Sequence, residues 1–80
     1  VFITPAAASA QAEALAAGLA NSMCLGVGQF CTQPGLIVCV RDSAGALREA
    51  LSARIAATPA GDMLTESMAA AYRTAVAQRE

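Results

Sequence analysis

Three cysteines are the most nucleophilic side chains of this 80-residue chain. Cys31 lies in an irregular stretch, Gly26–Gly35, which contains three glycines and a proline. Glycine allows unusual backbone dihedral angles and close approach of a ligand, and the thiolate of a cysteine is a strong nucleophile. From these residues alone, Cys31 is as readily a packed side chain as a nucleophile. Cys24 and Cys39 are predicted to be small buried hydrophobic residues, one at the end of a helix and one in a strand.

The residue content excludes several kinds of cysteine site within these 80 residues. The chain has no histidine, so any base for Cys31 must come from outside it, and a complete cysteine–histidine pair is excluded. The three cysteines do not form a CxxC pair, which argues against a zinc site and against a thiol-redox protein. An odd number of widely spaced cysteines does not indicate a disulfide framework. Free cysteines predict a reducing, cytoplasmic location.

Charge and hydropathy exclude two classes of partner. The net charge is −1, with arginines and acids scattered along the chain, so no basic patch is available for nucleic acid. A membrane span needs roughly 18 or more strongly apolar residues in a row. The longest apolar stretch, residues 6–20, is mostly alanine and contains Gln11 and Glu13. We therefore expect neither a nucleic-acid partner nor a membrane.

Two short apolar runs predict β-strands. Val1–Ile3 has the composition of the end of a buried strand, and Leu36–Val40 is a continuous run of apolar residues with no polar alternation. Such runs are typical of parallel strands that are covered on both faces. Since the segment between them is helical, we expect an α/β fold in the order strand, helix, strand, helix, helix, with parallel strands buried by helices.

Three helices are predicted from capping residues and from apolar residues at helical spacing. The first begins at Thr4-Pro5 or near Ser9 and ends near Gly26, the second begins at Arg41-Asp42-Ser43 and ends at Pro59-Ala60-Gly61, and Thr65 caps the third. The third helix is expected to continue to Glu80. The apolar stripes are Leu15, Leu19 and Met23, then Leu47, Leu51 and Ile55, and finally Met68, Tyr72 and Val76.

A family resemblance is carried by the residues around Cys31. Gly28-Gln29-Phe30-Cys31 resembles the Gly-Gln-x-Cys active-site signature of the aldehyde dehydrogenase superfamily. The longer stretch Leu25–Gly35 and the later segment Gly61–Thr65 are similar to the NADP-dependent α-ketoglutarate semialdehyde dehydrogenases. The chain departs from these patterns at Gln33, where that branch usually has asparagine, at Pro34, and at Gly26, where the superfamily commonly has asparagine.

The resemblance implies a mechanism centred on Cys31. The cysteine would attack the aldehyde carbon to give a thiohemiacetal, hydride would pass to NADP or NAD, and a glutamate-activated water would hydrolyse the resulting thioester. The backbone N–H of Cys31 would form half of the oxyanion hole. Phe30 and Thr32 would line the substrate pocket, with Met23 and Cys24 approaching from the preceding helix.

The resemblance also implies that residues 1–80 are a partial catalytic domain. Both ends look cut, and the dinucleotide-binding domain and the glutamate base would lie elsewhere in a parent chain that forms a homo-oligomer. The 80 residues alone would then bind no cofactor and no metal and show no turnover. The competing hypothesis is a small, non-enzymatic α/β module that folds by self-assembly, because two strands are too few to be stable alone.

Overall fold

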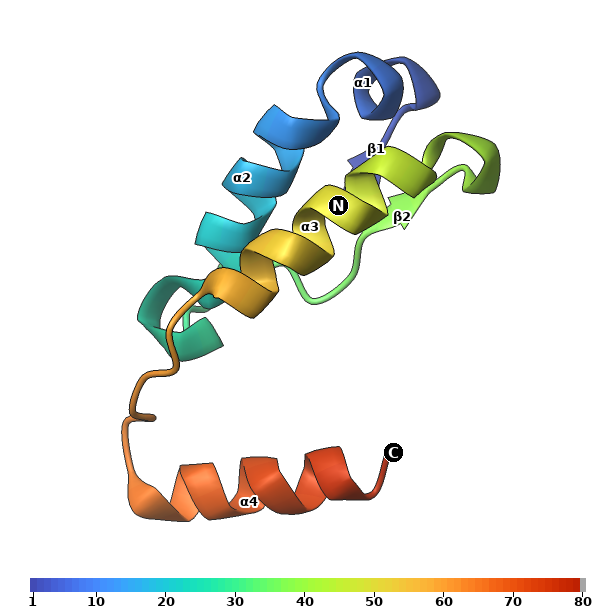
Figure 1. The fold of residues 1–80 in the computed structure, drawn as a ribbon. Helices are drawn as coiled ribbons and strands as arrows, with labels where there is room; N and C mark the ends of the chain where they lie inside the picture. Colours follow the sequence, from blue (N-terminus) through green and yellow to red (C-terminus); the bar gives the residue numbers. More distant parts are fainter. Residues whose placement is uncertain (80) are drawn as a thin grey trace.

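A computed structural model describes residues 1–79 and contains two strands, four α-helices and two 3₁₀ helices (Figure 1). In chain order these are β1 (Phe2–Ile3), α1 (Pro5–Ala10), α2 (Ala12–Cys24), η1 (Leu25–Gly28), β2 (Val38–Cys39), η2 (Arg41–Ser43), α3 (Gly45–Ala57) and α4 (Glu66–Ala77). The predicted order of strand, helix, strand, helix, helix is confirmed, although the first helix is divided into α1 and α2. The described part of the chain is therefore a mostly helical α/β unit.

The two strands pair in parallel, as predicted, but the sheet is smaller and more exposed than the sequence indicated. Phe2 pairs with Val38, and Ile3 pairs with Cys39. Strand β2 has two residues, whereas the apolar run predicted five residues from 36 to 40. Phe2 is 84% exposed and Val38 is 39% exposed, whereas Ile3 and Cys39 are half-buried. The prediction that both faces are covered is therefore wrong for this chain, because its helices pack against one face.

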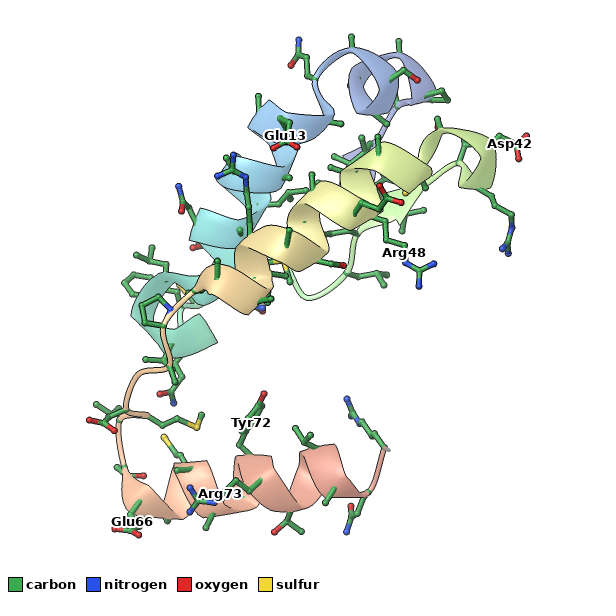
Figure 2. All side chains as sticks on the ribbon, in the orientation of Figure 1. Glu13, Asp42, Arg48, Glu66, Tyr72 and Arg73 are labelled. Atoms are coloured by element: carbon green, nitrogen blue, oxygen red, sulfur yellow. The ribbon has the colours of Figure 1, made fainter. Side chains whose placement is uncertain are left out.

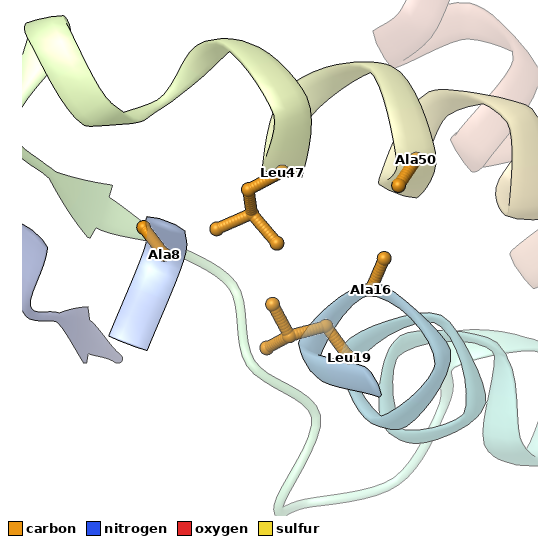
Figure 3. Close-up of a cluster of buried hydrophobic side chains, with 5 residues drawn as sticks. All are labelled: Ala8, Ala16, Leu19, Leu47 and Ala50. Carbon is orange, nitrogen blue, oxygen red and sulfur yellow. The ribbon is translucent and has the colours of Figure 1, made fainter. Parts of the chain in front are cut away.

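The core lies where α2 and α3 cross, close to α1 (Figure 3). It contains the side chains of Ala8, Ala16, Leu19, Leu47 and Ala50. The alanines allow the two helices to approach closely, while the two leucines provide most of the buried side-chain volume. Half-buried apolar residues surround this centre, namely Ile3, Ala12, Leu15, Ile37 and Leu51. A core with so few large side chains contributes little hydrophobic stabilisation, as expected for a chain of this length.

Two of the predicted helix starts are confirmed by their capping hydrogen bonds. The Thr4 hydroxyl accepts a hydrogen bond from the backbone N–H of Ala7 (3.4 Å), and Pro5 occupies the first turn of α1. The Thr65 hydroxyl accepts from the backbone N–H of Met68 (3.2 Å) at the start of α4. These local patterns satisfy N–H groups that have no partner within the helix itself.

The predicted start of the second helix at Arg41-Asp42-Ser43 is wrong. These residues form the separate 3₁₀ helix η2, and α3 begins only at Gly45. The Ser43 hydroxyl donates back to the carbonyl of Val40 (3.1 Å), so it does not cap the following N–H groups. A serine that bonds to its own preceding backbone favours a turn over a helix start. The predicted end at residues 59–61 is close to the observed end at Ala57.

Helix α4 stands apart from the α2–α3 pair (Figure 1). Its predicted apolar stripe is exposed by 44% at Met68, 59% at Tyr72 and 37% at Val76. None of the described residues of α4 is buried. The helix ends at Ala77, so the expected continuation through Gln78 and Arg79 is wrong, while Glu80 lies outside the described residues. None of the helices in residues 1–79 is long and apolar enough to cross a lipid bilayer.

Candidate active site

A left-handed loop connects α2 to the turn that carries Cys31. Gly26, Val27 and Gly28 have φ angles of 58°, 60° and 77°. Glycine adopts such angles readily, whereas a β-branched residue such as Val27 does so rarely and at a cost in strain. Three successive left-handed residues end α2 abruptly and redirect the chain. The glycines of the signature thus determine where the next residues lie.

Gly26 is required for a second reason, which is the position of the Phe30 ring. A Cβ atom built on Gly26 would lie 2.6 Å from Cδ2 and 2.7 Å from Cε2 of Phe30. The aromatic ring therefore packs directly over the Gly26 backbone. The ring is still 52% exposed, so its other face is available for contact.

Cys31 lies at the centre of a tight turn. The backbone N–H of Gln33 donates to the carbonyl of Phe30 (3.1 Å), which leaves Cys31 and Thr32 at the two central positions. Both central residues are exposed, and Cys31 is a free thiol. Within residues 1–79 the backbone N–H of Cys31 donates no hydrogen bond to a protein acceptor. The structure therefore brings Phe30, Cys31 and Thr32 together in one accessible turn, with a backbone donor available beside the thiol.

The other two cysteines differ from Cys31 in their surroundings. Cys24 at the end of α2 and Cys39 in β2 are both free and half-buried, so they are less enclosed than the predicted packed side chains. Cys39 packs on the side of the sheet that faces α3. The difference in exposure makes Cys31 the most accessible thiol of the three.

A cavity of about 670 Å³ opens between the end of α2, the loop that follows α3, and α4. Figure 2 shows the Tyr72 side chain pointing from α4 toward the rest of the molecule, where it lines this cavity. Met23 and Cys24 line the cavity, whereas Phe30, Cys31 and Thr32 are not part of its described lining. The cavity is thus beside the candidate nucleophile's loop and does not form a pocket around the thiol.

Gln29 is a site residue that the sequence reasoning did not single out. Its side-chain oxygen accepts a hydrogen bond from the backbone N–H of Leu64 (2.9 Å). Its amide nitrogen donates to Sδ of Met68 (3.3 Å). A signal was available, because Gln29 belongs to the Gly-Gln-x-Cys pattern and Leu64 belongs to the Gly61–Thr65 segment that supported the same resemblance.

The described residues do not fit a metal or a dinucleotide. No group of three or more histidine, cysteine, aspartate or glutamate side chains that could hold a metal ion is present in residues 1–79. A dinucleotide-binding glycine loop leads from a strand into the N-terminus of a helix. The loop Gly26–Gly28 instead follows the C-terminus of α2 and leads into the Cys31 turn, so it does not offer that phosphate site.

Comparison with known proteins gives one informative relative. No family model matches the chain, and no solved structure matches it. The chain is 45% identical over 74 residues to alpha-ketoglutaric semialdehyde dehydrogenase 2 from Azospirillum brasilense, an alignment that covers 91% of the chain. This chain is related to an aldehyde dehydrogenase. The predicted relation is thereby confirmed, while the chain spans only 14% of the relative's length.

Proposed function

We propose that this chain is the nucleophile-bearing part of the catalytic domain of a longer, NAD(P)-dependent aldehyde dehydrogenase. The proposed substrate is α-ketoglutarate semialdehyde, in line with the name of the relative that shares 45% of the aligned residues. The observation that carries the proposal is the placement of Cys31. It is an exposed free thiol at the centre of a tight turn, two residues after Gln29 of the signature.

The geometry of the turn suits attack on a carbonyl carbon. In the proposed step, the Cys31 thiolate forms a bond to the aldehyde carbon, and the π electrons of the carbonyl move to its oxygen. The negative charge on that oxygen needs donors that are already in position. The backbone N–H of Cys31 can serve, because it lies beside the sulfur and donates to no protein acceptor among the described residues.

The neighbours of Cys31 supply part of the substrate contact. Phe30 offers an aromatic face that is fixed over Gly26, and Thr32 offers a hydroxyl on the other side of the thiol. Both are exposed in this chain, so other parts of the parent protein would form the remaining walls of the pocket. Those parts would also provide the glutamate base and bind the NAD(P) that accepts the hydride. The proposal therefore assigns Cys31 to catalysis and Phe30 and Thr32 to substrate binding.

The test is aldehyde oxidation by the full-length protein that contains this segment. NADP and NAD reduction would be followed by absorbance with a panel of aldehydes that includes α-ketoglutarate semialdehyde. We expect Cys31→Ala to abolish activity, because alanine cannot form the covalent intermediate. The matched control is Cys39→Ala, which removes a half-buried thiol from β2 and should keep activity. Retention of activity by Cys31→Ala would refute the proposal.

A second candidate function is a non-enzymatic α/β module that folds by self-assembly. The bare face of the sheet favours it, because Phe2 is 84% exposed and Leu36 is 71% exposed. Exposed apolar residues that adjoin one another often mark an interface. Size-exclusion chromatography with light scattering of the 80-residue chain distinguishes the two candidates. The module is supported if the 80-residue chain forms a well-folded oligomer and no longer protein that contains it oxidises an aldehyde.

A further inference from the structure

We infer that Gln29 is a positioning residue that anchors the Cys31 turn to the segment before α4. The inference rests on the proposed role of Cys31 as the nucleophile and deepens it. In this inference, Gln29 holds the Cys31 thiol in position and does not contact the substrate. The partner of the anchor is a backbone group of the Gly61–Thr65 segment.

Both ends of the Gln29 amide are engaged, and this determines its orientation. The oxygen accepts from the Leu64 N–H at 2.9 Å, and the nitrogen contacts the Met68 sulfur at 3.3 Å. The first bond has good geometry for an amide donor and carbonyl-type acceptor, whereas thioether sulfur is a weak acceptor. The Leu64 bond is therefore the main anchor, and Met68 favours the same orientation of the amide.

A second contact joins the same two segments next to Gln29. Cγ2 of Val27 lies only 3.2 Å from the position that a Cβ atom on Gly61 would occupy. The linker between α3 and α4 therefore packs closely on the left-handed loop. Val27 has a φ of 60°, which is a strained angle for a β-branched residue and persists only where the surroundings hold it.

The anchor acts on the nucleophile through a short stretch of backbone. Cys31 follows Gln29 by two residues and is itself exposed. The hydrogen bond to Leu64 joins residues 35 positions apart, and the bonds of the turn itself are local. Loss of the anchor would free the loop to move relative to the linker. A displacement of the thiol and its neighbouring N–H of about 1 Å would lower the rate substantially.

The experiment uses the full-length protein with Gln29→Leu, Gln29→Glu and the control Gln11→Leu. Gln11 is an exposed residue between α1 and α2 whose side chain makes no capping bond, so the control introduces the same change of side chain far from the turn. Glutamate at position 29 keeps an oxygen that can accept from Leu64. Rates are divided by the concentration of folded protein, so that a smaller folded fraction does not lower them.

We expect Gln29→Leu to lower kcat by roughly 5- to 30-fold, the range that one or two hydrogen bonds of ordinary strength allow. Gln29→Glu should recover most of this loss, a rescue that a general effect on folding would not produce. Leu64→Pro removes the donor of the same bond and should lower kcat similarly, with no further loss in the double variant Gln29→Leu/Leu64→Pro.

The inference is overturned if Gln29→Leu matches Gln11→Leu while Cys31→Ala is inactive, or if Gln29→Glu is as impaired as Gln29→Leu. Activity that survives Cys31→Ala is a different result, because it refutes the proposed nucleophile itself. The two failures are thus distinguished within one set of variants.

Discussion

Replacing Gly26 by alanine should damage the candidate site in two separable ways. The φ of Gly26 is 58°, and a residue with a Cβ atom adopts this angle at a cost of roughly 1–2 kcal/mol. The new Cβ would also lie 2.6 Å from Cδ2 of Phe30, too close for any contact. Because Phe30 is 52% exposed, the ring can rotate away into solvent. We therefore expect the clash to displace the Phe30 ring. This displacement should add little to the loss in the free energy of unfolding.

Gly28→Ala is the matched variant for this prediction. Gly28 has a φ of 77°, so alanine meets a similar backbone strain, but its Cβ would lie 3.3 Å from the Met23 carbonyl oxygen and would not meet Phe30. Urea unfolding of the full-length protein should show a loss of about 1–2 kcal/mol for both variants. The KM for the aldehyde should rise about fivefold to tenfold more in Gly26→Ala, because half of an aromatic side chain's burial is worth roughly 1 kcal/mol.

Asparagine at position 26 separates the two effects further. Asparagine adopts left-handed angles more readily than alanine, and the superfamily that the signature resembles commonly has it at this position. Gly26→Asn should therefore cost less stability than Gly26→Ala while still displacing the Phe30 ring and raising KM. If Gly26→Ala changes neither stability nor KM, then the left-handed loop and the ring position described for this site are wrong.

Two further predictions concern the core and the isolated chain. Leu47 is 2% exposed at the centre of the α2–α3 contact, so Leu47→Ala should lower the free energy of unfolding by about 2–3 kcal/mol. Leu64→Ala, at a position that is 80% exposed, should change the free energy of unfolding by less than about 0.5 kcal/mol. Urea unfolding measures this free energy for both variants. The purified 80-residue chain should produce no NADPH when NADP and an aldehyde are added, since the proposed base and dinucleotide site lie outside it. Measurable NADPH production would refute the proposal that these two sites lie outside the 80 residues.

The features that the sequence predicted well are those determined by neighbouring residues. Thr4 and Thr65 are predictable as helix caps, because a hydroxyl at that position satisfies a free N–H a few residues later, whatever the rest of the fold does. The break after α2 was likewise visible in the glycines at positions 26 and 28, which favour left-handed angles. The parallel pairing of β1 and β2 followed from the helical segment between them.

Two features differ from the sequence-based expectation, one through a local hydrogen bond and one through a contact between distant segments. Arg41–Ser43 has the composition of a helix start, yet Ser43 bonds backward to Val40 and the helix begins later. The role of Gln29 depends on Leu64, which lies 35 residues further along the chain. No local pattern specifies such a pairing. Gln29 belongs to the signature, but the signature does not indicate what its side chain contacts.

Cys31 shows how far residue chemistry alone can take the assignment of a site. Its loop made it as readily a nucleophile as a packed side chain, and the structure adds that the thiol is exposed beside an available N–H. Neither observation identifies a substrate, because the described cavity lies next to the loop and does not enclose the thiol. The relation to a semialdehyde dehydrogenase is what supports the proposed role of this accessible thiol in aldehyde oxidation.

The bare face of the sheet would be covered by the rest of the parent chain under the proposed function, and by a second copy under the alternative. The run Leu36–Val40 is apolar on both of its faces, but in the described residues Val38 and Val40 remain 39% and 52% exposed. Apolar side chains that are this exposed add less stability than fully buried ones, and a two-stranded sheet is marginal by itself. A continuous apolar run of this kind is typical of a strand that is covered on both faces. The proposed parent chain would provide that second cover, and the apolar residues of β1 and β2 then have a physical reason to be there.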